Sequence, residues 1–381
     1  MPDASADART RVLIAGGGVA AAECALALAD LAPSQTEVSV LAPNAELSYR
    51  PLAVRVPFGH GPLSAFPLAP IVADAGGELV VERLEWVDPK SRIAHTSGGA
   101  ELGYDALVIA VGALARPRYE HALTIDDAHI DELLHGLIQD IEEGYTRELA
   151  FVIPARMGWP FPIYELALMS AGRAYDMDEQ LSVSIVTPED RPLGIFGDAA
   201  SSAVEERLAR ANISVLTSAY AEIPAPGEIR IGPGDRTITA QRIVALPELY
   251  GPPISGLPSA EHGFLRTDES GRMFDVGPVY VAGDARDFPI KHGGLAAQEA
   301  DAVAESIAAI AGAPVTPKPF TPVIEGILLT ESKPLYLRAQ VTGGHGFSSE
   351  VSETPIDDSP PAKIAAKYLS RYLQAHETLP A

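Results

Sequence analysis

The chain has one cysteine, Cys24, among 381 residues. A single cysteine excludes an internal disulfide, a thiolate cluster for zinc or iron–sulfur, and a dithiol redox centre. Cys24 stands in an alanine-rich segment behind a glycine turn, and we interpret it as a small buried apolar residue rather than a nucleophile.

Basic residues are also scarce. The chain carries 28 Lys and Arg against 51 Asp and Glu, a formal net charge of -23. Such a surface repels phosphate backbones and anionic lipids, so nucleic acid is not an expected partner. No apolar run reaches the ~18 residues of a membrane span. The first residues, 1–11, lack the pattern of a signal peptide, and we expect a cytoplasmic protein.

What the chain does have is a regular alternation of strands and helices. Residues 11–14 form an apolar strand, followed by Gly16-Gly17-Gly18, an alanine-rich helix over 19–31 and a second strand over 37–41. This order predicts a βαβ unit. A similar alternation over 149–216 predicts a second α/β unit. We expect strand 242–246 to return to the first unit, and residues 49–70 to form an ordered excursion without regular structure.

The first turn reads Gly16-x-Gly18-x-x-Ala21. In this spacing the first glycine permits a tight turn, the second admits a pyrophosphate close to the backbone, and the small third residue lets helix pack on strand. The free N–H groups of the helix start, at Val19 and Ala20, would then face the phosphates. The carboxylate that usually ends the next strand is absent, because Ala42-Pro43 stands there. Asn44, Glu46 or backbone groups are the alternatives for the ribose.

A second motif lies far along the chain. The apolar strand 277–282 delivers Gly283-Asp284, and Lys291-His292-Gly293-Gly294 precedes a helix expected from Leu295. The aspartate can accept hydrogen bonds from ribityl hydroxyls, and the helix start can stabilise a reduced flavin ring. A third glycine turn, Ala110 to Gly112, ends the strand near 109.

Together these motifs resemble the FAD-binding signatures of the pyridine nucleotide-disulfide oxidoreductase superfamily. Within it, the chain is similar to sulfide:quinone oxidoreductases and, more distantly, to type II NADH dehydrogenases. Supporting stretches are Tyr49 to Leu52, Phe151 to Glu165, Phe288 to Lys291 and Leu329 to Pro334. The resemblance implies an α/β protein with two Rossmann-like dinucleotide-binding domains and FAD as the cofactor.

The domains expected from this resemblance are a discontinuous FAD domain over 1–120 and 240–312, a second, degenerate NAD(P)-type domain over 121–239, and a C-terminal α+β extension over 313–381 for an interface or dimer. The cofactor-binding candidates come from the three glycine turns, the 49–52 stretch and the start of the last long helix. They are Gly16, Gly18, Val19, Ala20, Ala42, Arg50, Pro51, Ala110, Gly112, Gly283, Asp284, Lys291, Gly293, Gly294 and Leu295.

The chain departs from that family at the redox cysteines. The resemblance aligns the first with Gly158 or Trp159 and the second near Lys333. Sulfide oxidation through a cysteine persulfide is therefore not expected. In the second unit, the prolines of Pro154 to Pro162 replace a glycine-rich turn, which disfavours NAD(P)H at its usual place.

The candidate catalytic residues are Glu165, Lys291 and Lys333, with His292 as a further proton donor, and each has a structural alternative. Trp159, Phe161 and Tyr164 form either a substrate pocket or domain-interface core.

We expect electron transfer between a small-molecule donor and an acceptor such as a quinone. One alternative is an NAD(P)H:quinone dehydrogenase, since Ala297 to Ala300 resembles a quinone-site helix. Another is a flavin-binding protein without catalysis. The expected amphipathic helix 363–374 docks on its own domain or a homodimer partner rather than on a membrane.

Overall fold

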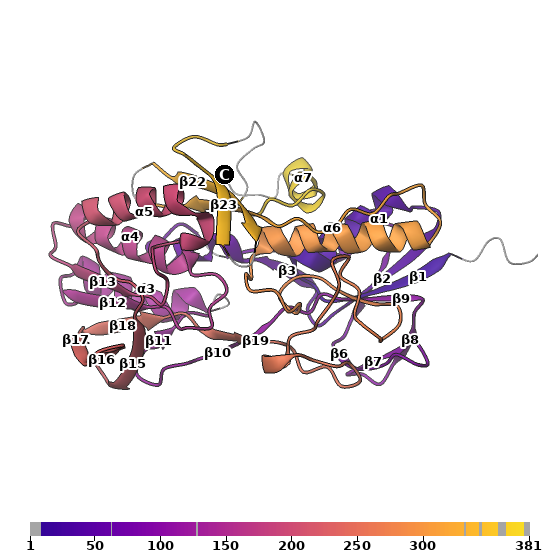
Figure 1. Cartoon of the computed structure of the whole chain (residues 1–381), viewed down its shortest axis with the longest axis horizontal. Coiled ribbons are helices and arrows are strands. Elements are labelled where there is room, and N and C mark those ends of the chain that lie inside the picture. Colours follow the sequence, from indigo (N-terminus) through magenta and orange to yellow (C-terminus); the bar gives the residue numbers. More distant parts are fainter. Residues whose placement is uncertain are drawn as a thin grey trace, which may run out of the picture.

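The structure is a computed structural model that describes residues 9–61, 63–126, 129–330, 333–342, 345–356 and 363–376, with the side chains of 342 and 345–347 left out. Pro62, and residues 331 and 332 of the 329–334 stretch, lie outside the described residues. Two α/β domains lie along the long axis of the molecule, and the C-terminal strands lie between them on one side (Figure 1).

The first domain is built on a parallel sheet with the order β20-β9-β1-β2-β5. Along β1 the side chains alternate between two cores: Val12 and Ile14 face the helices α1 and α6, whereas Leu13 faces the small antiparallel sheet β6-β7-β8. This is the pattern of a strand buried on both faces. The bounds are β1 (Thr10–Ala15), α1 (Val19–Leu31), β2 (Thr36–Ala42), α2 (Leu68–Asp74), β5 (Glu78–Val81), β6 (Leu84–Asp88), β7 (Ile93–Thr96), β8 (Glu101–Gly103), β9 (Ala106–Ile109), β20 (Val279–Val281) and α6 (Gly293–Ile310).

The second domain has a parallel sheet with the order β11-β18-β12-β13-β14. The expectation that strand 242–246 returns to the first domain is wrong, because β18 pairs in parallel with β12 through Leu149 and Arg242. The bounds are β11 (Leu123–Thr124), α3 (Ile130–Glu142), β12 (Glu148–Val152), α4 (Phe161–Asp176), β13 (Ser182–Val186), η2 (Gly194–Phe196), α5 (Asp198–Arg210), β14 (Ser214–Leu216), β15 (Tyr220–Ala225), β16 (Glu228–Gly232), β17 (Arg236–Thr239) and β18 (Arg242–Ala245).

The excursion over 49–70 is more regular than expected. It holds the hairpin β3 (Glu46–Tyr49) and β4 (Ser64–Pro67) around the 3₁₀ helix η1 (Arg50–Phe58). Pro51 suits the first helical turn because its fixed φ is helical and its missing N–H would be unpaired there. Buried apolar residues of η1, among them Val54 and Phe58, join the core of the second domain. The excursion therefore ties the two domains together.

A two-stranded ribbon, β10 (Leu114–Arg116) with β19 (Glu248–Tyr250), lies between the domains. After η3 (Glu261–Gly263) and α6, the antiparallel sheet β21 (Val323–Leu328), β22 (Leu335–Thr342) and β23 (His345–Ser352) packs beside α5 and η2. Its buried residues, such as Ile324 and Leu337, join the core of the second domain.

The last helix, α7 (Leu369–Ala375), is shorter than the predicted helix 363–374. The backbone before it bonds to side chains of the first domain instead: Tyr49 is hydrogen-bonded to the backbone of Ile364, and Glu23 accepts from the N–H groups of Tyr368 and Leu369. Leu369 and Leu373 are buried in the first domain, so the helix docks on its own chain. Within the described residues, no helix combines the length and apolarity that crossing a bilayer requires.

Candidate functional site

The first glycine turn requires a glycine at position 16. Its φ of +138° is one that other residues rarely adopt, and a Cβ there would lie 2.1 Å from the carbonyl oxygen of Ala110. Its N–H donates to the Leu41 carbonyl at 2.8 Å. The turn after β1 is therefore pressed against the turn after β9, where Ala110 and Gly112 lie.

Gly18 is different because it is open. It caps α1 with extended backbone and no side-chain hydrogen bond, and a Cβ there would meet nothing within 4 Å. The first bond of the helix runs from Ala22 N–H to the Gly18 carbonyl, so the preceding N–H groups, including those of Val19 and Ala20, stand at the start without helical partners. Free N–H groups beside open space suit an anion such as a pyrophosphate.

The second segment meets the first. Gly283 has φ +78°, and a Cβ there would lie 3.2 Å from Ala20 Cβ and 3.4 Å from Ala296 Cβ. Glu299 on α6 fixes this turn by accepting from Gly283 N–H at 2.7 Å and from Arg286 at 3.3 Å. The turns after β1 and β20, about 270 residues apart in the sequence, thus lie together at one edge of the sheet, as the motifs predict.

Asp284 is half-buried at this edge. Among the described residues its carboxylate accepts no hydrogen bond, and its nearest charges are those of Lys291 and Arg50. Burial raises the pKa of Asp284, while the two cations lower it. Three cofactor candidates, Arg50, Asp284 and Lys291, therefore gather at one place, with an acceptor left for a ligand. Pro51 follows Arg50 at the start of η1.

Ala42 lies on the opposite side of the first turn. It is fully buried at the end of β2, and a Cβ on Gly17 would lie 3.0 Å from Ala42 Cβ. Asn44 and Glu46, the alternatives for the ribose, are both exposed. No buried acid ends β2.

The start of α6 is covered by the C-terminal segment. The helix begins at Gly293, two residues before the predicted Leu295, and a Cβ on Gly293 would lie 3.0 Å from Ile364 Cδ1. His292 precedes it with a buried Nδ1 that has no partner in the described structure. Burial, and the charge of Lys363, lower the pKa of His292 to about 4, so the imidazole is neutral at ordinary pH.

Glu165 is held by a buried ion pair rather than facing an open site. Its Oε1 lies 2.5 Å from Lys363 Nζ and accepts from Leu329 N–H at 2.9 Å. Burial raises the pKa of Glu165 and lowers that of Lys363, while their mutual attraction opposes both shifts. Lys363, which the sequence reasoning placed only on a helix face, is the partner of this acid.

The other two catalytic candidates lie apart from Glu165. Lys291 is buried, donates from Nζ to the Arg286 carbonyl and lies 4.1 Å from the ring centroid of Phe264. Burial lowers its pKa. Lys333 is exposed, and its backbone carbonyl accepts from Thr330. In the described part of the chain, no hydrogen bond or ion pair joins Glu165, Lys291 and Lys333 to one another.

The aromatic candidates divide into two groups. Trp159 stacks on Phe161 with centroids 5.2 Å apart and lies 4.2 Å from His292, at the contact of the two domains. Tyr164 is fully buried in the second domain, where its hydroxyl donates to Glu189 at 2.5 Å. Trp159 and Phe161 therefore fit the interface alternative, with Trp159 partly exposed, and Tyr164 belongs to the core.

The turn after β12 is filled. A Cβ on Gly158 would lie 2.7 Å from Lys291 Cγ and 2.9 Å from the Pro289 carbonyl oxygen. The Gly158 carbonyl also accepts from Lys291 N–H at 3.2 Å. The loop that follows Asp284 thus packs against this turn and leaves no room beside Gly158.

Three acids were missed by the sequence reasoning as structural anchors: Glu23 and Glu299, which are buried, and Glu189, which is half-buried. Glu23 was visible as an acid within the apolar run of α1. Glu299 lies in the run that resembles a quinone-site helix, but it holds the Gly283 turn. Its neighbour Gln298 pairs with the Val323 backbone through both amide atoms, at 2.8 Å and 3.0 Å.

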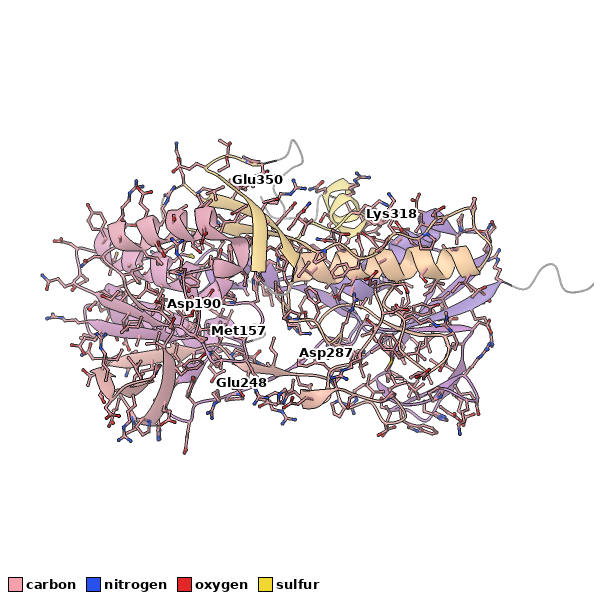
Figure 2. The ribbon with its side chains drawn as sticks, viewed as in Figure 1. Met157, Asp190, Glu248, Asp287, Lys318 and Glu350 are labelled. Carbon is pink, nitrogen blue, oxygen red and sulfur yellow. The ribbon has the colours of Figure 1, made fainter. Side chains whose placement is uncertain are left out.

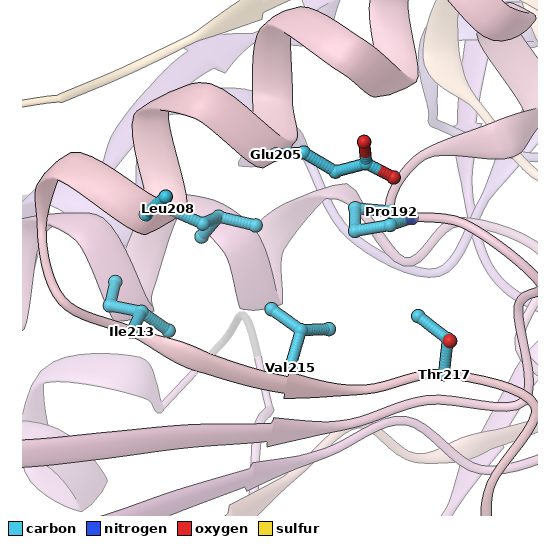
Figure 3. A pocket seen from close by; sticks show the side chains of 7 residues that line it. Pro192, Glu205, Leu208, Ile213, Val215 and Thr217 are labelled. Carbon is cyan, nitrogen blue, oxygen red and sulfur yellow. The ribbon is translucent and has the colours of Figure 1, made fainter.

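A small pocket in the second domain lies between α5 and β14 (Figure 3). Its volume is about 210 Å³, and Leu208, Ile213 and Val215 are among the residues that line it. This is below the ~300 Å³ of the smaller ligand sites. Within the described residues there is also no group of three His, Cys, Asp or Glu arranged to hold a metal ion.

Comparison with known proteins shows what this arrangement resembles. No family model matches the chain. A sulfide-quinone reductase of Aquifex aeolicus (strain VF5) is 24% identical over 265 residues, which are 64% of this chain and 59% of that protein, so the aligned part spans less than two thirds of the relative.

Among solved structures, the sulfide:quinone oxidoreductase of Aquifex aeolicus superposes with a TM-score of 0.76 at 19% identity, over 90% of this chain and 87% of that one. A ferredoxin reductase for the CYP199A2 system of Rhodopseudomonas palustris gives 0.64 at 19% identity, over 88% and 83%. The chain therefore has the fold of the FAD-dependent pyridine nucleotide-disulfide oxidoreductases, in a form similar to the sulfide:quinone reductases.

Proposed function

We propose that this chain is a FAD-dependent oxidoreductase that holds FAD without a covalent bond and passes electrons from a small-molecule donor to an acceptor such as a quinone. The observation that carries the proposal is the meeting of two distant turns, with Gly18 open on one side and, on the other, Asp284 without a hydrogen-bond donor among the described residues. Similarity to a sulfide-quinone reductase supports the acceptor class.

The residues fit the two ends of such a cofactor. The N–H groups of Val19 and Ala20 would hold the pyrophosphate, and the Asp284 carboxylate would accept from ribityl hydroxyls. Arg50 and Lys291 add positive charge beside Asp284. Bound FAD would supply the ability to accept and release electrons, and the protein would position it and exclude water.

Cysteine has no part in the proposed chemistry. Cys24 is fully buried in α1, and burial raises the pKa of its thiol, which leaves it protonated and unreactive. Gly158, Trp159 and Lys333, the positions aligned with redox cysteines, carry no thiol. We therefore propose a reaction other than sulfide oxidation through a cysteine persulfide.

An NAD(P)H-linked version of this function has less support, because the second turn is filled at Gly158. Rapid mixing tests it directly. If NADH or NADPH bleaches the flavin absorption within the turnover time, the pyridine nucleotide is a donor and binds by other contacts. A flavin protein without catalysis is the remaining alternative, and steady turnover with any donor and acceptor pair would exclude it.

A substitution of Gly18, which has room for a side chain in the protein, tests the proposal. In Gly18→Ala the new methyl group meets nothing in the protein, so the unfolding free energy should stay within ~0.5 kcal/mol. The same methyl group would stand where the pyrophosphate approaches, so we expect the FAD dissociation constant to rise at least about tenfold.

Gly136→Ala is the matched control, because Gly136 also has open space and lies in α3 of the second domain. It should keep its flavin. Wild-type protein purified without flavin, and unable to take up added FAD, would overturn the proposal. Equal FAD affinity in Gly18→Ala and the control would remove its main support.

A further inference from the structure

Positive charge gathers at one place on this acidic chain. Arg116, Arg156 and His262 lie around Tyr250, and Arg118 lies beside the adjacent Glu248; these four residues are here called the arginine cluster. The Cζ atoms of Arg116 and Arg156 lie 4.8 Å and 5.3 Å from the centroid of the Tyr250 ring. The His262 ring packs edge-on against the same ring at 6.1 Å. With 51 acids against 28 bases in the whole chain, such a cluster is against the general trend.

The ribbon β10–β19 explains how the cluster forms. Leu114 pairs with Tyr250 and Arg116 pairs with Glu248 in an antiparallel register. Side chains two residues apart on a strand share a face, and directly opposed side chains lie next to each other. The strand β10 therefore presents Arg116 on the face that carries Glu248 and Tyr250. Arg118 follows Arg116 by two residues, and its guanidinium group lies near the Glu248 carboxylate.

The acids nearby do not balance these charges. Glu248 accepts from the Tyr250 hydroxyl at 2.9 Å and lies 3.6 Å from Arg118 and 3.9 Å from Arg156. Glu261 lies 3.2 Å from His262, but its side chain is 85% exposed. In the described part of the chain Arg116 has no ion pair. Two guanidinium groups thus share one buried carboxylate, and the third, that of Arg116, lies beside them on the Tyr250 ring.

The guanidinium groups of the cluster stay open to solvent. The side chains of Arg118 and Arg156 are 53% and 42% exposed, whereas Glu248 beneath them is 11% exposed. Arg156 Nη1 also donates to the His262 ring, whose Nδ1 and Nε2 lie 2.5 Å and 2.7 Å away, so the ring is an acceptor and the cations of the cluster are the three arginines. The arrangement is a buried acid that positions a layer of cations above it, with N–H donors left over.

The location links the cluster to the second turn. Arg156 belongs to the segment between β12 and α4, and its carbonyl accepts from Leu249 N–H of β19. Figure 2 shows Glu248 in the middle of the molecule, where the two domains meet, below Met157 of the same turn. The turn that Lys291 and Pro289 cover at Gly158 therefore also contains Arg156 of the cluster.

We propose that the arginine cluster is a binding site for a small oxyanion, a compound with carboxylate or phosphate groups. The planar guanidinium fork matches both groups in a bidentate manner, and the Tyr250 ring supplies a platform that keeps two of the forks apart from each other. The surplus of positive charge selects an anion in a protein that otherwise repels anions. The site does not depend on bound flavin.

Isothermal titration of the full-length protein with two probes, inorganic pyrophosphate and citrate, tests the site at constant ionic strength. We expect saturable binding of at least one probe, at one site per chain, weakening as salt is raised. Whichever probe binds more tightly identifies phosphate or carboxylate as the preferred chemistry. Absence of saturable binding for both probes would overturn the proposal.

Variants locate the binding. Arg116→Ala with Arg118→Ala should weaken the bound probe at least about tenfold, and Arg116→Lys should weaken it less, since charge remains but the fork is lost. Arg230→Ala is the control, because Arg230 pairs with Glu228 on β16 and lies outside the cluster. Equal weakening in the control and the double variant would contradict the assignment. FAD content, measured in every variant, should stay at the wild-type level, which separates this test from that of the proposed function.

Discussion

The molecule contains the same strand–turn–helix edge twice, and the two turns differ in what lies above them. After β1, Gly18 faces open space and the helix start has free N–H groups. After β12, Gly158 is covered by Lys291 and Pro289. The loop that covers the second turn is the one that follows Asp284 at the first. The loop that covers the second turn thus also belongs to the edge where the first turn lies.

The helices that follow the two turns share a feature. Each buries a glutamate that holds the C-terminal segment: Glu23 of α1 accepts from Tyr368 and Leu369 N–H at 2.8 Å and 2.6 Å, and Glu165 of α4 pairs with Lys363. The segment 363–376 is therefore fastened to both domains. Because it also lies on Gly293 at the start of α6, it fixes how the domains face each other near the candidate flavin site.

The two domains also differ in whether an acid follows the second strand of the unit. The strand β2 ends in Ala42 and Pro43 without an acid, whereas β13 is followed by Thr187, Pro188 and Glu189. Glu189, however, is turned inward and bound by the hydroxyls of Tyr164 and Thr187. The second domain thus has an acid just after β13, but side-chain hydrogen bonds within the domain hold it. Presence of a residue type at a familiar position does not by itself make a site.

The largest effect is expected at the open turn. Gly16→Ala would place a methyl group 2.1 Å from the Ala110 carbonyl oxygen at a φ of +138°. We expect a loss of about 5 kcal/mol or more, or no folded protein, because the clash is with backbone. Denaturant unfolding measures it, with Gly18→Ala as the neighbour that should be tolerated. A stable Gly16→Ala protein with full FAD content would show that the turn is not built as described.

The next largest effect is expected at the buried ion pair of Glu165 and Lys363. Lys363→Met leaves the Glu165 carboxyl buried without its cation, and we expect a loss of about 3 to 5 kcal/mol in the unfolding free energy. Adding Glu165→Leu should recover most of that loss, since no buried charge then remains. Thermal and denaturant unfolding of the two single variants and the double variant form the cycle. Additive losses would mean that the pair is not coupled.

Much of the first domain could be predicted from sequence because its signals are local. The strand 11–14, the turn at Gly16 and the helix behind it stand next to each other in the chain. The meeting of Gly283 with Ala20 followed from two strands that end at the same sheet edge. Strand 242–245 was assigned to the wrong sheet because its apolar pattern fits either one, and sheet membership depends on where the chain crosses between domains.

The site could be predicted less well than the fold. Lys363 and Glu165 are 198 residues apart, and no periodicity links them. The same holds for the helix expected from 363, which begins only at Leu369, where the backbone around its start bonds to Tyr49 and Glu23. The arginine cluster depends on the register of two three-residue strands, which are too short to leave a pattern. Interactions between distant segments decide these features.

A pH experiment sharpens the comparison of strand ends. Burial raises the pKa of Glu189 to about 7, so the folded protein binds its proton more tightly than the unfolded chain does. The stability that this proton contributes is complete below the unfolded pKa near 4.5 and is lost as pH rises to about 7, to a maximum of ~3 kcal/mol. In Glu189→Gln the fall in unfolding free energy between pH 4.5 and 7.5 should be smaller than in wild type by about that amount. Parallel pH profiles would show that the pKa of Glu189 is the same in the folded protein as in the unfolded chain.

The smallest effect separates the two turns most directly. In Gly158→Ala the new methyl group would crowd Lys291 Cγ and the Pro289 carbonyl, and we expect a loss of about 1 to 2 kcal/mol in stability. FAD affinity should change less than in Gly18→Ala, where stability is kept and affinity falls. Gly158→Ala is thus predicted to lose mainly stability, and Gly18→Ala is predicted to lose mainly FAD affinity. A Gly158→Ala protein of normal stability with the larger loss of FAD would reverse the roles of the turns, because the second turn would then be the one that a nucleotide approaches.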